Sequence, residues 1–414
     1  MIKDSLYDWV VIGGGVSGIA ISEILCREGK SVLLLEKNQT LASETSKDFH
    51  EWVHSGALYT LVPDNLLTLR YLLGATDDII EFYSCYPRMN LLPTENGIKM
   101  HGDGWFNDDK IEFRYRSHKL NPIWLSMVSR SISIIDLISN HDWLRRRAGS
   151  EYGKSKVKMS FNFNRVSDQL RNREKFFKIQ SPDFTMNSRD LLSDMLSSAV
   201  LMGLEIKTEA KVDFLNELDS HVEIGVQGKI YQSKNSVITS PDAISEFMNV
   251  PIKEGFAPMA IVENVPEEEK SFVELDYFIN KCINLLKKKN GIGQAGGITV
   301  NKEHKVEDYL QYVIQEHKKR NPEIKLIDTY VGIKKELVQK KEDRNYLYHI
   351  NQNSSKIWSV VLGKFTLAFS MAPEFYRRNY FMNPRKDVLI SEESATNKSL
   401  SKTAWQEIVD IQKG

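Results

Sequence analysis

The strongest structural signal in the chain is the segment YDWVVIGGGVSGIAISEILCREGKSVLLLE, residues 7–36. Short apolar runs at Tyr7–Ile12 and Ser31–Leu35 predict two buried strands. Between them, apolar residues recur at helical spacing over Val16–Arg27, and Gly29 follows at the position that a C-terminal cap prefers. The segment therefore predicts a right-handed strand–helix–strand unit with parallel strands.

The turn between the first strand and the helix carries a dinucleotide-binding pattern. Gly13, Gly15 and Gly18 fit G-x-G-x-x-G, whose glycines permit a tight turn, close approach of a pyrophosphate, and close packing of helix on strand. The phosphate charge would lie at the helix N-terminus, where free N–H groups and the helix dipole favour it. Glu36 ends the second strand, where a carboxylate can accept hydrogen bonds from ribose hydroxyls. The nucleotide-binding residues predicted in this unit are Ile12, Gly13, Gly15, Val16, Ser17, Gly18, Glu36 and Lys37.

Two alternatives stay open at this point. The turn could be glycine-rich without holding a ligand, and Glu36 could be a surface acid. The pattern also serves both FAD and NAD, so it does not by itself identify the dinucleotide.

The composition restricts the class of protein. The chain has 414 residues, 41% of them hydrophobic, which suffices for a large core and suggests two or three domain-sized units. Basic and acidic residues are balanced at 55 each, which argues against a surface that attracts nucleic acid. Cys26, Cys85 and Cys282 share no metal-ligand spacing and suit a reducing compartment, so we expect a cytoplasmic protein without a metal site.

The sequence predicts neither a targeting signal nor a membrane-spanning segment. The first apolar run breaks into glycines at Gly13, which does not suit a signal peptide. No apolar run reaches 18 residues, so we predict no transmembrane segment. A peripheral membrane contact stays open.

Similar patterns return later in the chain. They predict a helix over Ser188–Met202, and a final strand over Ile357–Leu362 followed by a helix from about Thr366. A hairpin is predicted around Gln227 and Gly228. The remaining short strands are predicted at Leu204–Lys207, Val212–Leu215, Val222–Val226, Lys229–Tyr231 and Ser236–Thr239.

A family resemblance begins directly after the nucleotide-binding unit. Residues Ala42–Tyr59, ASETSKDFHEWVHSGALY, resemble the second motif of the FAD-dependent D-amino-acid oxidase-like superfamily. Within that superfamily the chain most resembles the FAD-dependent glycerol-3-phosphate dehydrogenase and L-2-hydroxyglutarate oxidase branches. The matching residues are Thr45, Ser46, His54, Gly56 and Tyr59.

Later segments continue the resemblance in order and spacing. Asn187–Val212 is similar to the helix–Gly–strand passage that gives a backbone contact to adenine, expected near Val212. Thr329–Lys334, TYVGIK, resembles "T-Y-A-G-x-R", and Arg344 with Tyr346 resembles "R-D-Y". Ser359–Thr366, SVVLGKFT, resembles the last flavin-binding turn.

The resemblance implies FAD as the cofactor and adds a set of flavin-binding residues. Small and hydroxyl-bearing side chains suit a loop beside the pyrophosphate and flavin, and glycines allow the backbone close to the flavin ring. A helix beginning after Gly363 would direct its positive end toward the flavin and stabilise the reduced ring. The residues implied are Ser43, Thr45, Ser46, His54, Val212, Gly332, Gly363, Lys364, Phe365 and Thr366.

Pattern and resemblance together predict an α/β protein. Its FAD-binding Rossmann-like domain, of the glutathione-reductase type, would comprise residues 1–80, 183–250 and 329–382. Residues 81–182 and 251–328 would form an inserted α+β substrate domain built on an antiparallel sheet, for which we find no resemblance. The polar tail, residues 383–414, is expected to be loosely attached.

A histidine, a tyrosine and three cationic residues are candidates for the chemistry. His54 could accept or orient the proton of the substrate, although a purely structural histidine and a covalent flavin link through His54 or His50 are alternatives. Tyr59 could bind substrate or fill the core. Arg344 and Lys334, with Lys335, could hold an anionic substrate, against the alternative of a solvated charge run.

The chain departs from the family pattern at three places. Lys334 replaces an arginine. A guanidinium group can form bidentate hydrogen bonds to a carboxylate or phosphate, whereas an ammonium group offers a point charge. Ser240-Pro241-Asp242 replaces an "A-A-G" step, and Leu362 replaces a glycine. These changes affect the substrate prediction more than the cofactor prediction.

The leading functional prediction is an FAD-dependent dehydrogenase or oxidase. It would oxidise a CH–OH group of an anionic small molecule, such as a hydroxy acid, a polyol phosphate or a sugar-linked substrate, by hydride transfer to flavin N5. An amine or amino-acid oxidase on the same scaffold and a catalytically degenerate flavin-binding protein are the alternatives. The sequence does not indicate the electron acceptor, which could be oxygen, a quinone or another protein.

Overall fold

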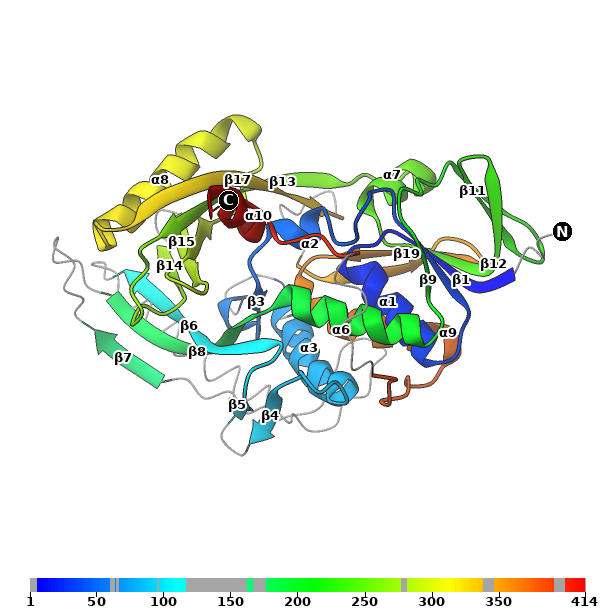
Figure 1. Cartoon of the computed structure of the whole chain (residues 1–414), viewed down its shortest axis with the longest axis horizontal. Helices are drawn as coiled ribbons and strands as arrows, with labels where there is room; N and C mark the ends of the chain where they lie inside the picture. The colour runs from blue at the N-terminus through cyan, green and yellow to red at the C-terminus, as the bar shows by residue number, and fades with distance from the viewer. Residues whose placement is uncertain are drawn as a thin grey trace.

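Two large β-sheets organise the chain, one in each half of the molecule, in the computed structural model (Figure 1). The structure describes residues 6–59, 64, 67–94, 97–116, 162–166, 176–276, 281–337, 346–390 and 399–413. Within this described part, every helix is too short or too polar to traverse a bilayer.

The first sheet contains the strand–helix–strand unit predicted at the N-terminus. The unit consists of β1 (Leu6–Ile12), α1 (Val16–Arg27) and β2 (Val32–Leu35), and its strands are parallel. The parallel part of the sheet has the order β9 (Glu205–Lys207), β2, β1, β12 (Lys229–Ile238), β19 (Ile357–Leu362). Antiparallel strands extend it at β10 (Phe214–Glu217), β11 (Val222–Val226) and β18 (Tyr348–Gln352).

Both faces of this sheet are covered, which explains why β1 is a continuous apolar run. Trp9 and Val11 point to the face packed by helices, whereas Val10 and Ile12 point to the opposite core. The helical face carries α1, α3 (Leu67–Tyr83), α6 (Ser188–Leu201) and α9 (Ala368–Tyr380). The opposite core includes Ile244 from α7 (Pro241–Met248).

Within the described residues, the second sheet is mostly antiparallel and has nine strands. Its main order is β17, β13, β16, β15, β14, β6, β8, β3, with β7 beside β8, and the β6–β14 pair is parallel. The strands are β3 (Trp52–Val53), β6 (Phe106–Arg116), β7 (Asn162–Val166), β8 (Phe176–Met186), β13 (Lys253–Glu263), β14 (Phe272–Asp276), β15 (Lys281–Lys287), β16 (Gly293–Gly297) and β17 (Lys325–Glu336). A separate two-stranded sheet joins β4 (Leu91–Thr94) and β5 (Gly97–Met100).

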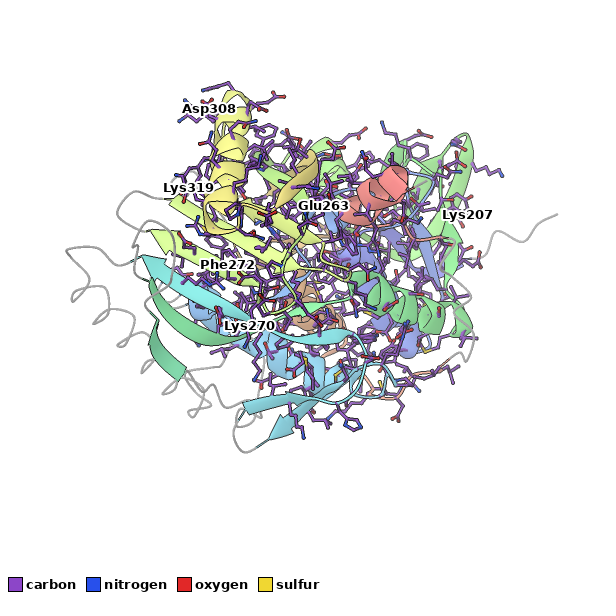
Figure 2. The ribbon with its side chains drawn as sticks, turned by 60° about the vertical axis from the view of Figure 1, so that its left-hand side comes forward. Lys207, Glu263, Lys270, Phe272, Asp308 and Lys319 are labelled. Atoms are coloured by element: carbon purple, nitrogen blue, oxygen red, sulfur yellow. The ribbon has the colours of Figure 1, made fainter. Side chains whose placement is uncertain are left out.

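One face of the second sheet is covered by α8 (Val306–Arg320). Figure 2 shows α8, with Asp308 and Lys319 exposed on it, above the sheet that carries Phe272. Ile283 and Leu285 of β15 pack into the core beneath α8. Alternate residues of β15 therefore point to the other face, which is the face that borders the functional site described below.

The elements differ from the sequence predictions at several boundaries. The strands predicted at Lys229–Tyr231 and Ser236–Thr239 are one strand, β12, because Lys234 and Asn235 continue its pairing. The strand predicted at Val212–Leu215 begins at Phe214. The final helix begins at Ala368, after a 3-10 turn at Phe365–Leu367. The second sheet also incorporates β3 and β17, which reach outside the residues predicted for the substrate domain.

The prediction of a loosely attached tail is wrong for residues 399–413. Leu400 bridges Leu41 in parallel, and the Ser401 backbone N–H donates to the Leu41 carbonyl at 3.0 Å. α10 (Ala404–Lys413) packs on β17 and α2 (Thr45–Asp48). The tail therefore returns to the loop after β2, which is part of the functional site.

Candidate functional site

The turn between β1 and α1 shows why two of its glycines are required. Gly13 has φ +110°, a conformation that side chains disfavour. A Cβ on Gly18 would lie 1.9 Å from the carbonyl oxygen of Gly13. The Thr239 hydroxyl donates to that same carbonyl at 2.9 Å and holds the turn against the end of β12.

Gly15 differs, because the space beside it is open. Among the described residues, only the Ser46 Oγ lies within 4 Å of a Cβ built on Gly15, at 3.2 Å. Gly15 also lines the cavity described next. The position thus leaves room for a group that approaches the backbone at the N-terminus of α1.

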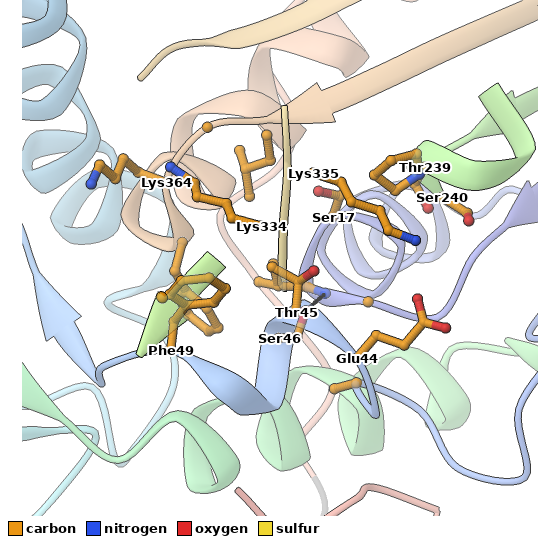
Figure 3. Close-up of a pocket in the computed structure, with 18 of the residues that line it drawn as sticks. Ser17, Glu44, Thr45, Ser46, Phe49, Thr239, Ser240, Lys334, Lys335 and Lys364 are labelled. Carbon is orange, nitrogen blue, oxygen red and sulfur yellow. Dashed lines mark hydrogen bonds between the residues drawn. The ribbon is translucent and has the colours of Figure 1, made fainter. Parts of the chain in front are cut away.

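A cavity of about 770 Å³ opens beside this turn and extends to the second sheet. Its volume is within the range of roughly 300–1,000 Å³ that is typical of ligand sites. In Figure 3, Lys334 and Lys364 lie toward one end of the cavity, Thr45 and Ser46 near the middle, and Glu44 toward the other end. The predicted site residues that line it are Ile12, Gly13, Gly15, Val16, Ser17, Glu36, Lys37, Ser43, Thr45, Ser46, His54, Tyr59, Val212, Lys334, Gly363, Lys364 and Phe365.

Glu36 closes one end of the cavity with a fixed carboxylate. Its Oε2 accepts a hydrogen bond from the Gly14 N–H at 2.6 Å, and its Oε1 accepts one from the Asn38 N–H at 2.8 Å. Each carboxylate oxygen keeps a second lone pair, so the group can still accept from a ligand hydroxyl. Val212 is buried and lines the same end.

Lysines at this end are neutralised by acidic neighbours. Lys37 pairs with Glu44 at 2.8 Å and with Asp242 at 3.1 Å. Lys335 also pairs with Asp242. Lys335, which the sequence suggested as a holder of an anionic substrate, therefore has its charge compensated by the first turn of α7.

The loop after β2 is held from behind by α6 and the C-terminal segment. Arg189 of α6 donates to the Ser46 carbonyl at 2.5 Å and to the Ser401 carbonyl at 3.1 Å. Glu51 accepts from Ser188 at 2.7 Å and from the Trp405 indole at 3.0 Å. These contacts orient the side of the loop that lines the cavity.

His54 lies at the other end of the cavity in an aromatic setting. It stacks on Trp52 with ring centroids 4.2 Å apart and meets the edge of Tyr59 at 5.6 Å. Its Nδ1 is buried and lacks a hydrogen-bond partner among the described residues, and the nearest acid, Asp183, lies 3.8 Å from it. Asp183 instead accepts from the Trp52 indole at 2.9 Å and from Ser55.

Burial and positive neighbours keep His54 neutral. Loss of hydration lowers the pKa of His54 well below its usual value, and Lys364, His50 and Lys334 lower it further. Burial also raises the pKa of Asp183 to about 6. Because His54 is neutral, we infer that it and Asp183 do not form an ion pair, and the 3.8 Å between Nδ1 and the carboxylate is also too long for a hydrogen bond.

Two lysines and two tyrosines form a cationic and aromatic wall next to His54. The Lys364 ammonium lies 5.1 Å from the ring centre of Tyr59 and 5.2 Å from that of Tyr346. Lys334 lies 5.8 Å from the Tyr346 ring and pairs with Glu336, two residues further along β17. All four line the cavity. Tyr346 was noted in the sequence only as part of a matching motif.

Three predicted residues lie outside the cavity wall. Gly18 packs under the turn, and Thr366 is fully buried, where its hydroxyl accepts from the His54 backbone N–H at 3.1 Å. A Cβ on Gly332 would face Asp48 at 3.1 Å, because the strand places this glycine against α2. Arg344 lies outside the described residues.

Several cavity residues were not identified from the sequence. Thr239 and Ser240 come from the step after β12, while Asn284, Met259 and Thr299 come from or adjoin the second sheet. The departure Ser240-Pro241-Asp242 from the family pattern was the signal for Ser240, and Thr239 ends the strand predicted at Ser236–Thr239. The residues of the second sheet could not be recognised from the sequence, since their strands are adjacent only in the folded chain.

A metal centre finds no support in the part of the chain that the structure describes. No group of three or more histidine, cysteine, aspartate or glutamate residues there could hold a metal ion. Cys26 is buried, and burial raises the pKa of its thiol well above the usual range.

Comparisons with known proteins bear on this geometry. The sequence profile of the family described as FAD dependent oxidoreductase matches residues 8–243. The solved structure of L-alpha-glycerophosphate oxidase from Mycoplasma pneumoniae with FAD bound is similar over 97% of this chain and 100% of that chain, with a TM-score of 0.67 and 13% identity.

Amino-acid-oxidising proteins share the same architecture. The unusual amino acid oxidase NikD is similar over 97% of this chain and 98% of its own, with a TM-score of 0.66 and 12% identity. L-amino acid deaminase from Proteus vulgaris is similar over 92% and 95%, with a TM-score of 0.66 and 13% identity. At these identities the likeness concerns the fold, and the predicted fold class is confirmed.

One curated relative matches over a short segment. UDP-galactopyranose mutase of Mycoplasma pneumoniae is 54% identical over 35 residues, which cover 8% of this chain and 9% of the mutase. A match of this length carries no conclusion about the activity of the whole chain.

Proposed function

Because the chain belongs to the family of FAD dependent oxidoreductases, we propose that it oxidises a CH–OH group of an anionic small molecule. The substrate would be a hydroxy acid, a polyol phosphate or a sugar-linked anion. The observation that carries this proposal is the presence of a neutral imidazole, His54, and an ammonium group, Lys364, in the wall of one cavity.

The cavity suits FAD, the cofactor of the family, along its whole length. The open space beside Gly15 and the N-terminus of α1 would take the pyrophosphate, assisted by the hydroxyls of Ser17 and Ser46. The carboxylate of Glu36 would accept from the ribose, and the backbone near Val212 would border the adenine. The flavin would then lie toward Gly363 and His54.

When bound, FAD supplies the acceptor for the hydride, at flavin N5. The role of His54 is to take the hydroxyl proton of the substrate, and a base must be unprotonated to do so. The lowered pKa of His54 provides that state at neutral pH. This need for a base favours an alcohol over an amine, because an amine can lose its proton to water before it binds.

The negative group of the substrate would be held by Lys364 and Lys334. Both lie against aromatic rings, which excludes water and strengthens the attraction between charges. Glu336 compensates part of the charge of Lys334, so we assign the larger share to Lys364. Tyr59 would position the substrate between this wall and His54.

The test is anaerobic reduction of the purified yellow protein by matched alcohol and amine compounds. We expect bleaching of the flavin by glycerol 3-phosphate or by 2-hydroxy acids, and none by the corresponding 2-amino acids. Bleaching by amino acids with release of ammonia would support the amine oxidase alternative. A yellow protein that no compound bleaches would support the degenerate flavoprotein.

A variant connects the chemistry to His54. We expect His54→Gln to retain FAD and to lose about 10²–10⁴-fold in bleaching rate, the usual contribution of a general base. His221→Gln, on the β11 hairpin, is the matched control and should bleach like the natural protein. An unchanged rate in His54→Gln would remove this residue from the proposed chemistry.

A further inference from the structure

The second sheet forms one side of the cavity, opposite the nucleotide-binding turn. Val273 of β14 pairs with Asn284 of β15, and Leu275 pairs with Cys282. These four residues line the cavity. The intervening residues of β15, including Ile283, point away toward α8. Asn284 therefore presents an amide from a wall that is otherwise mostly apolar.

The amide of Asn284 is incompletely satisfied. The residue is 4% exposed, and its Oδ1 has no hydrogen-bond partner within the described ranges. His50 lies beside it, where a side-chain contact with Asn284 opposes the lowering of the His50 pKa, and its Nε2 likewise has no well-formed hydrogen bond among the residues that the structure describes. A Cβ on Gly296, the register partner of Asn284, would lie 3.1 Å from that Nε2.

The two side chains contact each other, yet Asn284 Oδ1 and His50 Nε2 have no well-formed hydrogen bond within the described part of the chain. Each such atom costs about 1–3 kcal/mol when it lacks a partner, so buried polar groups are rarely left unpaired without a function. Both residues line the cavity, and His50 is near enough to His54 for the two imidazole groups to interact. The pair therefore lies next to the proposed reacting position.

The charges around Asn284 and His50 determine which kind of ligand group they can bind. Burial, followed by Lys288 and Lys364, lowers the pKa of His50 to about 3, so its imidazole is neutral. An ammonium group would be repelled by Lys364, whereas Glu51 compensates the charge of Lys288. A hydroxyl group is neutral, donates one hydrogen bond and accepts others, and so matches both the amide oxygen and either tautomer of the imidazole.

We propose that Asn284 and His50 form a subsite for a second hydroxyl group of the substrate, beside the one that is oxidised. The substrate is then a polyol-type anion, such as a glycerol, glycerate or sugar derivative, and not a simple mono-hydroxy acid. This inference rests on the proposed function, because it places the oxidised alcohol near His54.

The test measures binding without turnover, by calorimetry on the dithionite-reduced holoenzyme under anaerobic conditions. Two probe pairs differ by one hydroxyl group: glycerol 3-phosphate with 1,2-propanediol 1-phosphate, and glycerate with lactate. We expect the natural protein to bind the hydroxyl-bearing member of a pair about ten-fold more tightly. Asn284→Leu, which keeps the volume and removes the amide, should reduce that preference to less than two-fold.

Matched variants separate the subsite from general damage. Asn351→Leu, on the exposed side of β18, should keep the ten-fold preference. Asn284→Asp keeps an acceptor oxygen, so it should keep a preference for the hydroxyl while weakening the binding of both anions. FAD content and the urea midpoint establish that each variant is folded.

Three results would overturn the subsite: equal binding of the paired probes by the natural protein, binding of neither member, or a preference that survives Asn284→Leu. Bleaching of the oxidised protein by alcohols, with a preference unaffected by Asn284→Leu, would leave the proposed function intact and remove only this inference. Asn284-dependent binding without bleaching by any alcohol would contradict the proposed function and leave the subsite.

Discussion

Replacing Lys288 with methionine would leave a buried carboxylate without its ionic partner. Lys288 Nζ lies 2.7 Å from Glu51 Oε2, and the two side chains are 6% and 8% exposed. Glu51 follows His50 in the loop that borders the cavity, and it also accepts hydrogen bonds from Ser188 and Trp405. One carboxylate thereby joins the loop, the second sheet, α6 and α10.

The expected loss of stability is large because the negative charge of Glu51 remains buried without its ionic partner. Removing one partner of a buried ion pair typically costs about 3–5 kcal/mol. Glu51 keeps the two donors of Ser188 and the Trp405 indole, so we expect Lys288→Met to lower the free energy of unfolding by about 3 kcal/mol, the low end of that range. The loop would also lose its anchor, so FAD should dissociate more readily.

The effect should depend on pH in a defined direction. Burial by itself would raise the pKa of Glu51, but Lys288 and the hydrogen bonds from Ser188 lower it overall. In the natural protein this ionised group contributes stability above its unfolded pKa of about 4.3, which is lost as the pH falls through the lower folded value. Without Lys288 the folded pKa rises, so the difference between variant and natural protein should shrink as the pH falls toward 4.

Urea unfolding of the holoprotein at pH 7.5 and pH 4.5 measures both effects. The double variant Glu51→Gln with Lys288→Met should be more stable than Lys288→Met alone, since the unpaired charge is gone. Lys402→Met, which removes an exposed partner of Asp410, is the control and should leave the midpoint unchanged. A loss under 1 kcal/mol in Lys288→Met, or additive losses in the double variant, would refute the reasoning.

Other perturbations test the turn, the base and the tail. Gly15→Val should fold yet purify colourless, since its side chain enters the space beside the helix N-terminus, and stoichiometric FAD in that variant would contradict the placement. Gly18→Ala should lower the urea midpoint, because its Cβ meets the Gly13 carbonyl at 1.9 Å, and a natural midpoint would contradict the packing. The bleaching rate should not fall as the pH drops from 7.5 to 6, because the pKa of His54 lies well below 6.5 in the folded protein, whereas a half-maximal rate near pH 6.5 would indicate an ordinary histidine. Deleting residues 399–413 should weaken FAD binding, whereas the helix content measured by circular dichroism should fall only slightly. Unchanged FAD affinity would show that the tail does not support the loop.

Local patterns were enough for the nucleotide-binding unit. The predicted helix Val16–Arg27 has the bounds that the structure gives to α1, and the predicted strand Ile357–Leu362 is β19. Both follow from short-range physics: the spacing of apolar residues, the glycines of the turn, and strands that are buried on both faces. The FAD cofactor and the fold class, predicted with the help of a resemblance, are confirmed by the family match and by the solved structures.

The sequence was less informative about side chains that meet across the fold. Lys335 looked like a substrate ligand, yet an ion pair with Asp242 of α7 compensates its charge. Gly332 matched a flavin-binding motif, yet it faces Asp48 on α2. In both positions the outcome depends on an element that is distant along the chain.

The amino-acid sequence by itself determined the parallel unit around β1 and the glycine turn, because those features depend on neighbours within about thirty residues. Tertiary structure alone decided the environment of His54, the neutral state of its imidazole, the return of the C-terminal segment to the loop at Leu41, and the exposure of Asn284 to the cavity. Burial, charge and hydrogen bonding at these positions are set by strands and helices that come together only when the two sheets pack, and periodicity along the chain does not encode which of them will meet.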